Sequence, residues 1–113
     1  MNCDNQPKLD FAAAKTALAG AAEKFVTLFQ RGEARVLLFA PRGQDTQTPH
    51  TQDELYIVAA GSGTFVRGEE RIAFVAGDAL FVAATVPHRF ENFTDDFYTW
   101  VVFFGPKGGV PPT

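Results

Sequence analysis

Residues 48–58 read TPHTQDELYIV, a run that ends in alternating polar and apolar side chains. Side chains two positions apart on a β-strand lie on the same face of the sheet. One face of a strand here is therefore predicted to hold His50, Gln52, Glu54 and Tyr56. A buried carboxylate is costly among apolar strands unless it meets a cation. The run thus predicts a strand that brings an imidazole and a carboxylate together, where they favour a bound cation.

Outward from this run, the chain from Lys24 onward is a series of short runs rich in Val, Phe, Ile and Tyr. Turn residues, mostly glycine and acidic residues, separate these runs about every 8 to 12 positions. This spacing is typical of a β-sandwich or barrel. The predicted strands span residues 24–30, 34–40, 54–60, 64–67, 71–75, 79–82, 88–93 and 97–104. Eight strands suit a jelly roll, so the predicted fold class is all-β.

One short helix is predicted before the strands. Asp10 is a favourable N-cap, the alanine-rich run 11–19 favours helix, and Gly20 favours its end. We expect an N-terminal leader with this helix over residues 1–23 and one barrel domain over residues 24–105. Residues 106–113 are rich in glycine and proline and are predicted to form a flexible tail.

Composition excludes several classes of protein. The hydrophobic fraction of 46% supplies one core, and the lone Cys3 cannot form an intramolecular disulfide. The net charge of −3 and the lack of a basic cluster argue against nucleic acid as a partner. The start of the chain does not look like a signal peptide, and no run reaches the roughly 18 apolar residues of a membrane helix. We therefore expect a cytoplasmic protein that does not enter membranes.

A second informative stretch, residues 77–92, reads GDALFVAATVPHRFEN. It resembles the second cupin motif, G-x(5)-P-x-G-x(2)-H-x(3)-N. Gly77, His88 and Asn92 are in register, whereas Ala83 and Thr85 replace the proline and the second glycine. The resemblance implies a structural turn role for Asn92.

Residues 48–61 resemble the first cupin motif, G-x(5)-H-x-H-x(3,4)-E-x(6)-G, which Glu54 and Gly61 match at its end. If His50 is the second motif histidine, Thr48 occupies the place of the first. The other alignment makes His50 the first histidine and puts Gln52 in place of the second, but it shortens the gap to Glu54. On these motifs, and on their short spacer, the chain is identified as a small single-domain cupin of the cupin 2 type. The resemblance implies a double-stranded β-helix barrel.

The resemblance further implies one divalent metal ion bound by His50, Glu54 and His88. Two imidazoles and one carboxylate suit iron, manganese, nickel, zinc or copper better than magnesium, and three ligands leave coordination positions open. Thr48 and Gln52 are candidates for weak ligands or for hydrogen-bond partners of the ligands. The identity of the metal does not follow from the sequence.

A small organic molecule is the expected ligand of the barrel mouth. Tyr56, Phe90, Trp100 and Tyr98 are candidates for lining such a pocket, although aromatic residues at strand spacing more often form core. Cupin-like barrels include dioxygenases, isomerases and decarboxylases as well as proteins that only bind, so the resemblance does not select a reaction. Tyr56 and Tyr98 are the candidates for proton transfer beside the metal.

Two other interpretations stay open at this point. The barrel can be a non-catalytic binding protein, or a degenerate barrel without metal in which Glu54 pairs with Arg42 or Arg89. The resemblance also implies a homodimer, to which the hairpin over residues 24–40 would offer a strand edge.

Overall fold

The computed structural model describes residues 7–45 and 49–109. The helix and the eight strands of the prediction are all present, and their ends differ from the predicted ones by at most two residues. The elements are α1 (Phe11–Ala19), β1 (Phe25–Arg31), β2 (Ala34–Phe39), β3 (Asp53–Ala60), β4 (Ser62–Arg67), β5 (Glu70–Val75), β6 (Ala79–Val82), β7 (His88–Glu91) and β8 (Tyr98–Phe104).

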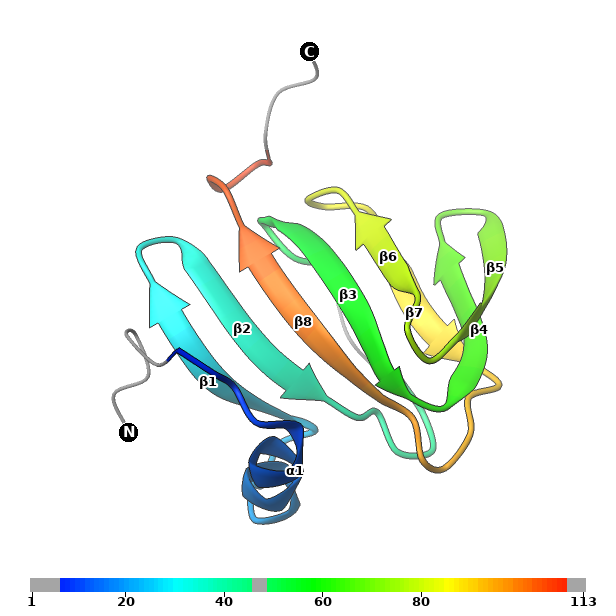
Figure 1. Cartoon of the computed structure of the whole chain (residues 1–113). Coiled ribbons are helices and arrows are strands. Elements are labelled where there is room, and N and C mark those ends of the chain that lie inside the picture. The colour runs from blue at the N-terminus through cyan, green and yellow to red at the C-terminus, as the bar shows by residue number, and fades with distance from the viewer. Residues whose placement is uncertain (1–6, 46–48, 110–113) are drawn as a thin grey trace.

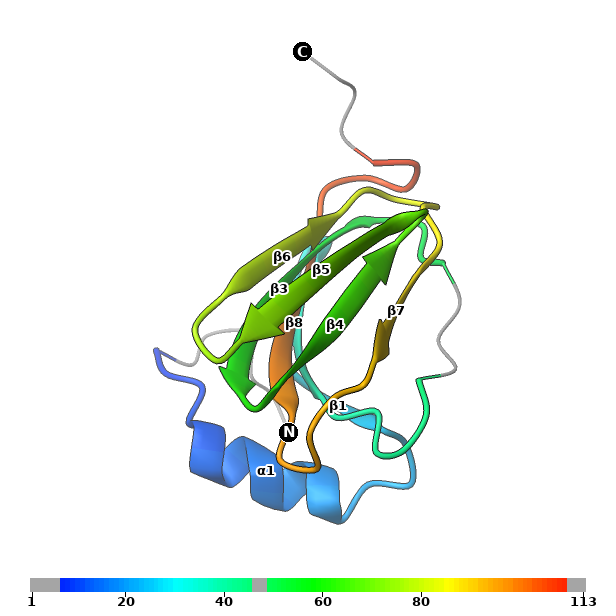
Figure 2. The ribbon, with the colours of Figure 1, turned by 90° about the vertical axis from the view of Figure 1, so that its right-hand side faces the viewer.

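The strands form two antiparallel sheets. The five-stranded sheet has the order β1-β2-β8-β3-β6, and the three-stranded sheet has the order β5-β4-β7. Figure 1 shows the larger sheet with α1 beneath it, and Figure 2 shows the smaller sheet in front of β3 and β8. The predicted all-β jelly roll with one short helix is confirmed. β1 is an edge strand, and the homodimer expected to form there stays a prediction.

Inward-facing side chains of the larger sheet form rows across β2, β8 and β3. The row at the start of β3 holds Arg35, Phe103 and Glu54. The following rows hold first Leu37, Val101 and Tyr56, and then Phe39, Thr99 and Val58. Polar side chains thus lie at the end of the barrel where β3 begins, which we call the mouth. In the other half of the interior, the side chains are mainly apolar, with Thr99 as the polar residue of its row.

Phenylalanine rings fill that other half. Phe65, Phe74, Phe90 and Phe97 are each at most 2% exposed and contact one another, with ring centroids 4.9 to 5.5 Å apart in the closest pairs. We call these four residues the aromatic cluster. It joins the two sheets, because Phe65, Phe74 and Phe90 come from the small sheet and Phe97 lies just before β8.

A tight backbone contact closes this end of the barrel at Gly61, the last glycine of the first motif. Its φ is +86°, and a Cβ atom there would lie 2.6 Å from the Cα atom of Phe97. Only glycine fits a position that combines left-handed backbone with such an approach. The motif glycine therefore has a packing role, far from the mouth.

The outer face of the larger sheet carries α1. Asp10 caps the helix by accepting a hydrogen bond from the Ala13 N–H at 2.9 Å, and Ala14 and Leu18 are buried against the sheet. Tyr98 and Trp100 pack in the same outer cluster, because alternate residues of β8 face opposite sides. The expectation that they line a pocket inside the barrel is therefore not met. Within the described residues, no helix is long and apolar enough to span a bilayer.

Candidate metal centre

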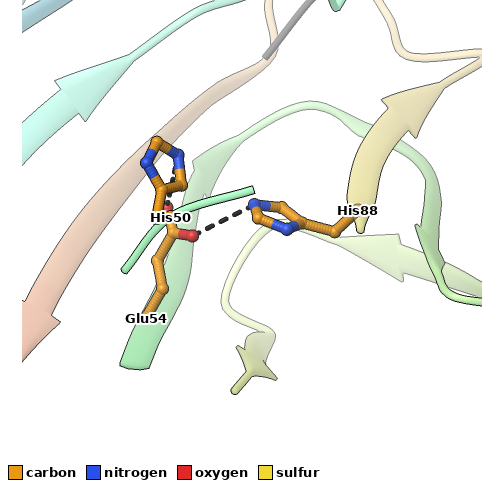
Figure 3. A group of neighbouring side chains, drawn as sticks. All are labelled: His50, Glu54 and His88. Atoms are coloured by element: carbon orange, nitrogen blue, oxygen red, sulfur yellow. Dashed lines mark ion pairs between the residues drawn. The ribbon is translucent and has the colours of Figure 1, made fainter. Parts of the chain in front are cut away.

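Three side chains converge at the mouth: His50, Glu54 and His88. His50 lies in the segment before β3, Glu54 on β3, and His88 at the start of β7, so the group bridges the two sheets (Figure 3). The Glu54 carboxylate approaches His88 Nε2 at 3.1 Å and His50 Nε2 at 3.9 Å. One potential ligand atom from each residue lies within 4.8 Å of the other two. This is a compact set of two nitrogen donors and one oxygen donor.

The three side chains differ in their access to solvent. The side chains of Glu54 and His88 are 2% and 1% exposed, whereas that of His50 is 34% exposed. The ring of His50 also packs edge-on against Phe103, with 4.8 Å between ring centroids. An ion bound by the group would therefore be reached from the side of His50, while Glu54 and His88 shield it from the barrel interior.

The ring of His88 is held in one orientation. Its Nδ1 atom lies 2.8 Å from the carbonyl oxygen of Val86. A carbonyl can only accept, so Nδ1 carries a proton and, in the neutral ring, Nε2 presents its lone pair to Glu54. Such a hydrogen bond from the second ring nitrogen is what orients histidine ligands in metal sites.

The fit of this group to a metal is visible in two buried atoms. His88 Nε2 and Glu54 Oε1 are 3.1 Å apart, and neither buried atom has a hydrogen-bond partner among the described residues. Two lone pairs facing each other in a buried site repel, unless a proton or a cation lies between them. Two imidazoles and one carboxylate are a donor set that suits a divalent transition metal. The residues present fit such an ion.

The loop between β6 and β7 holds both histidines in place. The Thr85 N–H donates to the carbonyl of His50 at 2.7 Å, and the Ala84 N–H donates to Asp53 Oδ1 at 2.9 Å. Thr85 has a φ of +68°, which is unfavourable for a β-branched residue. The second cupin motif has glycine at this position, so Thr85 keeps the left-handed turn at the cost of strain.

The pKa values of the two histidines are shifted in opposite directions. For His88, burial lowers the pKa, but the contact with Glu54, the bond to Val86 and the charges of Glu54 and Asp45 together raise it above its ordinary value. For His50, burial has the largest effect and the pKa is lowered, although Glu54 opposes this change. The charges of His88 and Arg35 lower the pKa of His50 further. His50 is therefore the more readily deprotonated nitrogen donor.

Other predicted candidates lie outside this group. β3 begins at Asp53, so Gln52 precedes the strand, and its amide donates instead to the carbonyls of Glu33 and Gly105 at 2.8 and 2.9 Å. Thr48 lies outside the described residues. Tyr56 is fully buried among apolar side chains, with its ring centroid 6.1 Å from that of His88.

Phe90 belongs to the aromatic cluster, and Asn92 follows it in the turn after β7. Phe90 is 2% exposed and belongs to the core, although it also borders a surface depression of about 310 Å³ with Asp45. Asn92 has a φ of +52° in the turn after β7, which agrees with its expected structural role. The pairing of Glu54 with Arg42 or Arg89 does not occur, since Glu54 contacts the histidines and Arg89 pairs with Glu91.

Sequence reasoning missed Arg35. It occupies an inward-facing position of β2, two residues before the buried Leu37, and its guanidinium carbon lies 4.6 Å from the centre of the Phe103 ring. The pattern Arg35-x-Leu37-x-Phe39 was the available signal, because it places a charged residue on the face of two core residues.

Comparisons with known proteins concern the family and the fold. The family model described as "Cupin domain" matches residues 35–104. An uncharacterized protein of Streptomyces coelicolor is 36% identical over 63 residues, which cover 56% of this chain and 60% of that relative. The match thus spans less than two thirds of the relative's length.

Solved structures share the fold. A cupin-2 domain protein from Shewanella frigidimarina superposes with a TM-score of 0.67 at 17% identity, covering 83% of this chain and 91% of that one. The DMSP lyase DddQ from Ruegeria pomeroyi superposes with a TM-score of 0.59 at 20% identity, covering 72% of this chain and 46% of that one. At these identities the likeness shows the fold alone. Because the family model covers more than half of its length, the chain belongs to the cupin family.

Proposed function

We propose that this cupin binds one divalent transition-metal ion through His50, Glu54 and His88, and that it binds or transforms a small organic molecule beside the ion. The observation that carries the proposal is the buried pair His88 Nε2 and Glu54 Oε1, which lie 3.1 Å apart without a hydrogen bond. A pair of buried polar atoms left in this state is costly, and a shared cation removes the cost.

The residues around the site have distinct roles in this proposal. The carbonyl of Val86 fixes His88, so that its Nε2 faces the ion, and the Thr85 N–H anchors the backbone of His50. Glu54 supplies the negative charge that partly compensates the ion. Three ligands leave coordination positions open for a substrate on the side of His50. A bound ion of this kind supplies Lewis-acid chemistry or oxygen activation.

The class of reaction stays open among those that cupin-like barrels carry out: dioxygenase, isomerase, decarboxylase or, as the name of one solved neighbour indicates, lyase. A non-catalytic binding protein is the second candidate function. It is favoured by the positions of the two tyrosines considered for proton transfer, because Tyr98 lies on the outer face of the sheet and Tyr56 is fully buried. A catalytic role would instead need a proton acceptor among the residues of the mouth.

Elemental analysis tests the metal proposal directly. The wild-type protein, purified without a metal-affinity tag, is expected to contain about one transition-metal ion per chain, and its identity would narrow the list of reactions. The His88→Ala variant, prepared in the same way, should contain almost none. If the wild type contains no metal and takes none up from solution, the metal-free barrel is the better description.

A further inference from the structure

Arg35 is a cation at the mouth, and none of the carboxylates that the structure describes pairs with it. It lies in the same inward-facing row as Phe103 and Glu54. Strands in a sheet are about 4.8 Å apart, so Arg35 starts two strands from Glu54, within the reach of a long side chain. Among the described residues, its guanidinium makes no ion pair or hydrogen bond, and its contact with the Phe103 ring is its principal interaction.

Phe103 connects Arg35 to the metal centre. The guanidinium carbon of Arg35 lies 4.6 Å from the centre of this ring, and the ring of His50 lies 4.8 Å from it. Arg35 and His50 therefore both contact the same ring at the mouth.

A small depression beside Arg35 provides room for a ligand group. It has a volume of about 160 Å³ and is bordered by Gln30, Gly32, Glu33, Arg35, Gln52, Gly105 and Lys107. Its charged residues are Arg35, Lys107 and the exposed Glu33, so positive charge prevails. The depression is smaller than the 300 to 1,000 Å³ or so that hold a drug-sized ligand, and it suits one terminal group of a small molecule.

The chemistry of the arginine side chain indicates which terminal group of a ligand would bind beside it. A half-buried guanidinium that makes only a cation–π contact recovers less free energy than one paired with a carboxylate. Its five N–H donors form a planar fork that matches a carboxylate with two parallel hydrogen bonds. A divalent ion bound by two neutral imidazoles and one carboxylate also keeps a net positive charge, which favours an anionic ligand at the mouth.

We propose that Arg35 is a specificity-determining residue that binds the carboxylate of a small anionic substrate, whose other end faces the metal on His50, Glu54 and His88. The part of this inference that concerns the metal rests on the proposed function. The part that concerns Arg35 is independent of it, because the argument for Arg35 uses only the lack of an anionic partner among the described residues and not a bound ion.

Malonate is a suitable probe, since it is a small dicarboxylate, and malonamide is its uncharged counterpart. Chemical-shift titrations would compare the wild type, Arg35→Gln and Arg35→Lys, each metal-free and after addition of zinc. We expect Arg35→Gln to bind malonate at least about tenfold more weakly in both forms, because a charge-assisted bidentate contact is lost. Arg35→Lys should keep part of the affinity, and malonamide should bind all three proteins equally weakly.

Arg71→Gln is the matched control, because it removes the same charge from an exposed residue that pairs with Glu91 on the small sheet. It should bind malonate like the wild type, and unfolding in urea would verify that every variant folds. Equal malonate affinity for the wild type and Arg35→Gln, with zinc bound normally, overturns the role of Arg35 and leaves the metal site standing. Failure of zinc to bind, with malonate binding still dependent on Arg35, contradicts the metal site and supports the role of Arg35.

Discussion

The two ends of the barrel interior are built from different side chains. The aromatic cluster of Phe65, Phe74, Phe90 and Phe97 fills one end and contains no polar atom that needs a partner. The mouth holds Glu54 and His88, whose side chains are as deeply buried as the phenylalanines, and the ring centroids of His88 and Phe65 are 6.3 Å apart. In the described chain, the buried side-chain polar atoms without hydrogen bonds are His88 Nε2 and Glu54 Oε1.

This difference separates the residues that stabilise the fold from those that bind a ligand. Buried aromatic rings contribute apolar area and close packing, and so they stabilise the protein without any ligand. A buried carboxylate and imidazole without hydrogen bonds reduce stability, unless a ligand or a proton compensates them. Substitutions at the two ends should therefore have opposite effects on stability and binding.

The largest loss of stability is expected at the aromatic cluster. Phe90→Ala removes a ring whose centroid lies 4.9 Å from the rings of both Tyr56 and Phe97. The cavity and the lost contacts should lower the free energy of unfolding by about 3 to 5 kcal/mol. Urea unfolding of the metal-free protein would measure this loss. A loss below about 1 kcal/mol would show that the cluster is not the main source of stability.

At the mouth, and at a pH above the folded pKa of His88, Glu54→Gln should leave the metal-free protein as stable as the wild type or increase its free energy of unfolding by about 1 kcal/mol; below that pH it also removes the charge that stabilises protonated His88. The amide keeps the shape of the side chain and removes a buried charge whose carboxylate oxygen Oε1 has no hydrogen-bond partner. The same urea experiment, in the presence of a chelator, gives the comparison with Phe90→Ala. A loss as large as that of Phe90→Ala would mean that Glu54 is a structural residue.

The pH dependence of stability should differ for the two histidines in the metal-free protein. His88 has a raised folded pKa, so its stabilisation is fully present below the unfolded value of about 6.5 and is lost as the pH rises through the folded pKa. His50 has a lowered folded pKa, so its contribution decreases as the pH falls from about 6.5 through that pKa.

These two contributions together favour a maximum of stability near pH 6.5, which unfolding curves between pH 5 and 8.5 would show. In the His88→Asn variant, the decrease above pH 6.5 should disappear, while the decrease below pH 6.5 remains. A wild-type protein whose stability rises steadily from pH 6.5 to 8.5 would contradict the assignment of the raised pKa to His88.

The smallest effect is expected at Thr85, which has a φ of +68° in the loop that holds both histidines. Thr85→Gly removes the strain of a β-branched residue in this conformation, but it also increases the conformational freedom of the unfolded chain. The change in the free energy of unfolding should be stabilising and no larger than about 1 kcal/mol. Thr85→Val, which keeps the branch, serves as the control. A clear loss of stability in Thr85→Gly would show that the threonine side chain itself stabilises the loop.

The sequence predicted the strands well, because turn residues interrupt the chain regularly and each strand is short. It also placed Glu54 on the interior face, since alternation along β3 leaves Glu54, Tyr56 and Val58 buried. Alternation failed at Gln52 because the strand begins only at Asp53, and Gln52 turns away toward Glu33 and Gly105.

Two other residues show where sequence reasoning stops. Both faces of β8 carry aromatic residues, so the sequence does not reveal which face is interior, and Trp100 packs against the helix side. Arg35 belongs to the mouth only because β2 pairs with β8, and β8 with β3, in a register that places Arg35, Phe103 and Glu54 in one row. Long-range register of this kind is not encoded in any local pattern.

Titration calorimetry of the metal-stripped protein tests the central claim most directly. The account predicts that wild type and Gln52→Ala take up one divalent metal ion with the same affinity. His50→Ala, Glu54→Gln and His88→Ala should each bind at least about 100-fold more weakly, because the loss of a ligand exceeds the 10- to 100-fold cost of losing an outer hydrogen-bond partner. Equal affinity for all five proteins would contradict the account, since the ion would then bind elsewhere or not specifically.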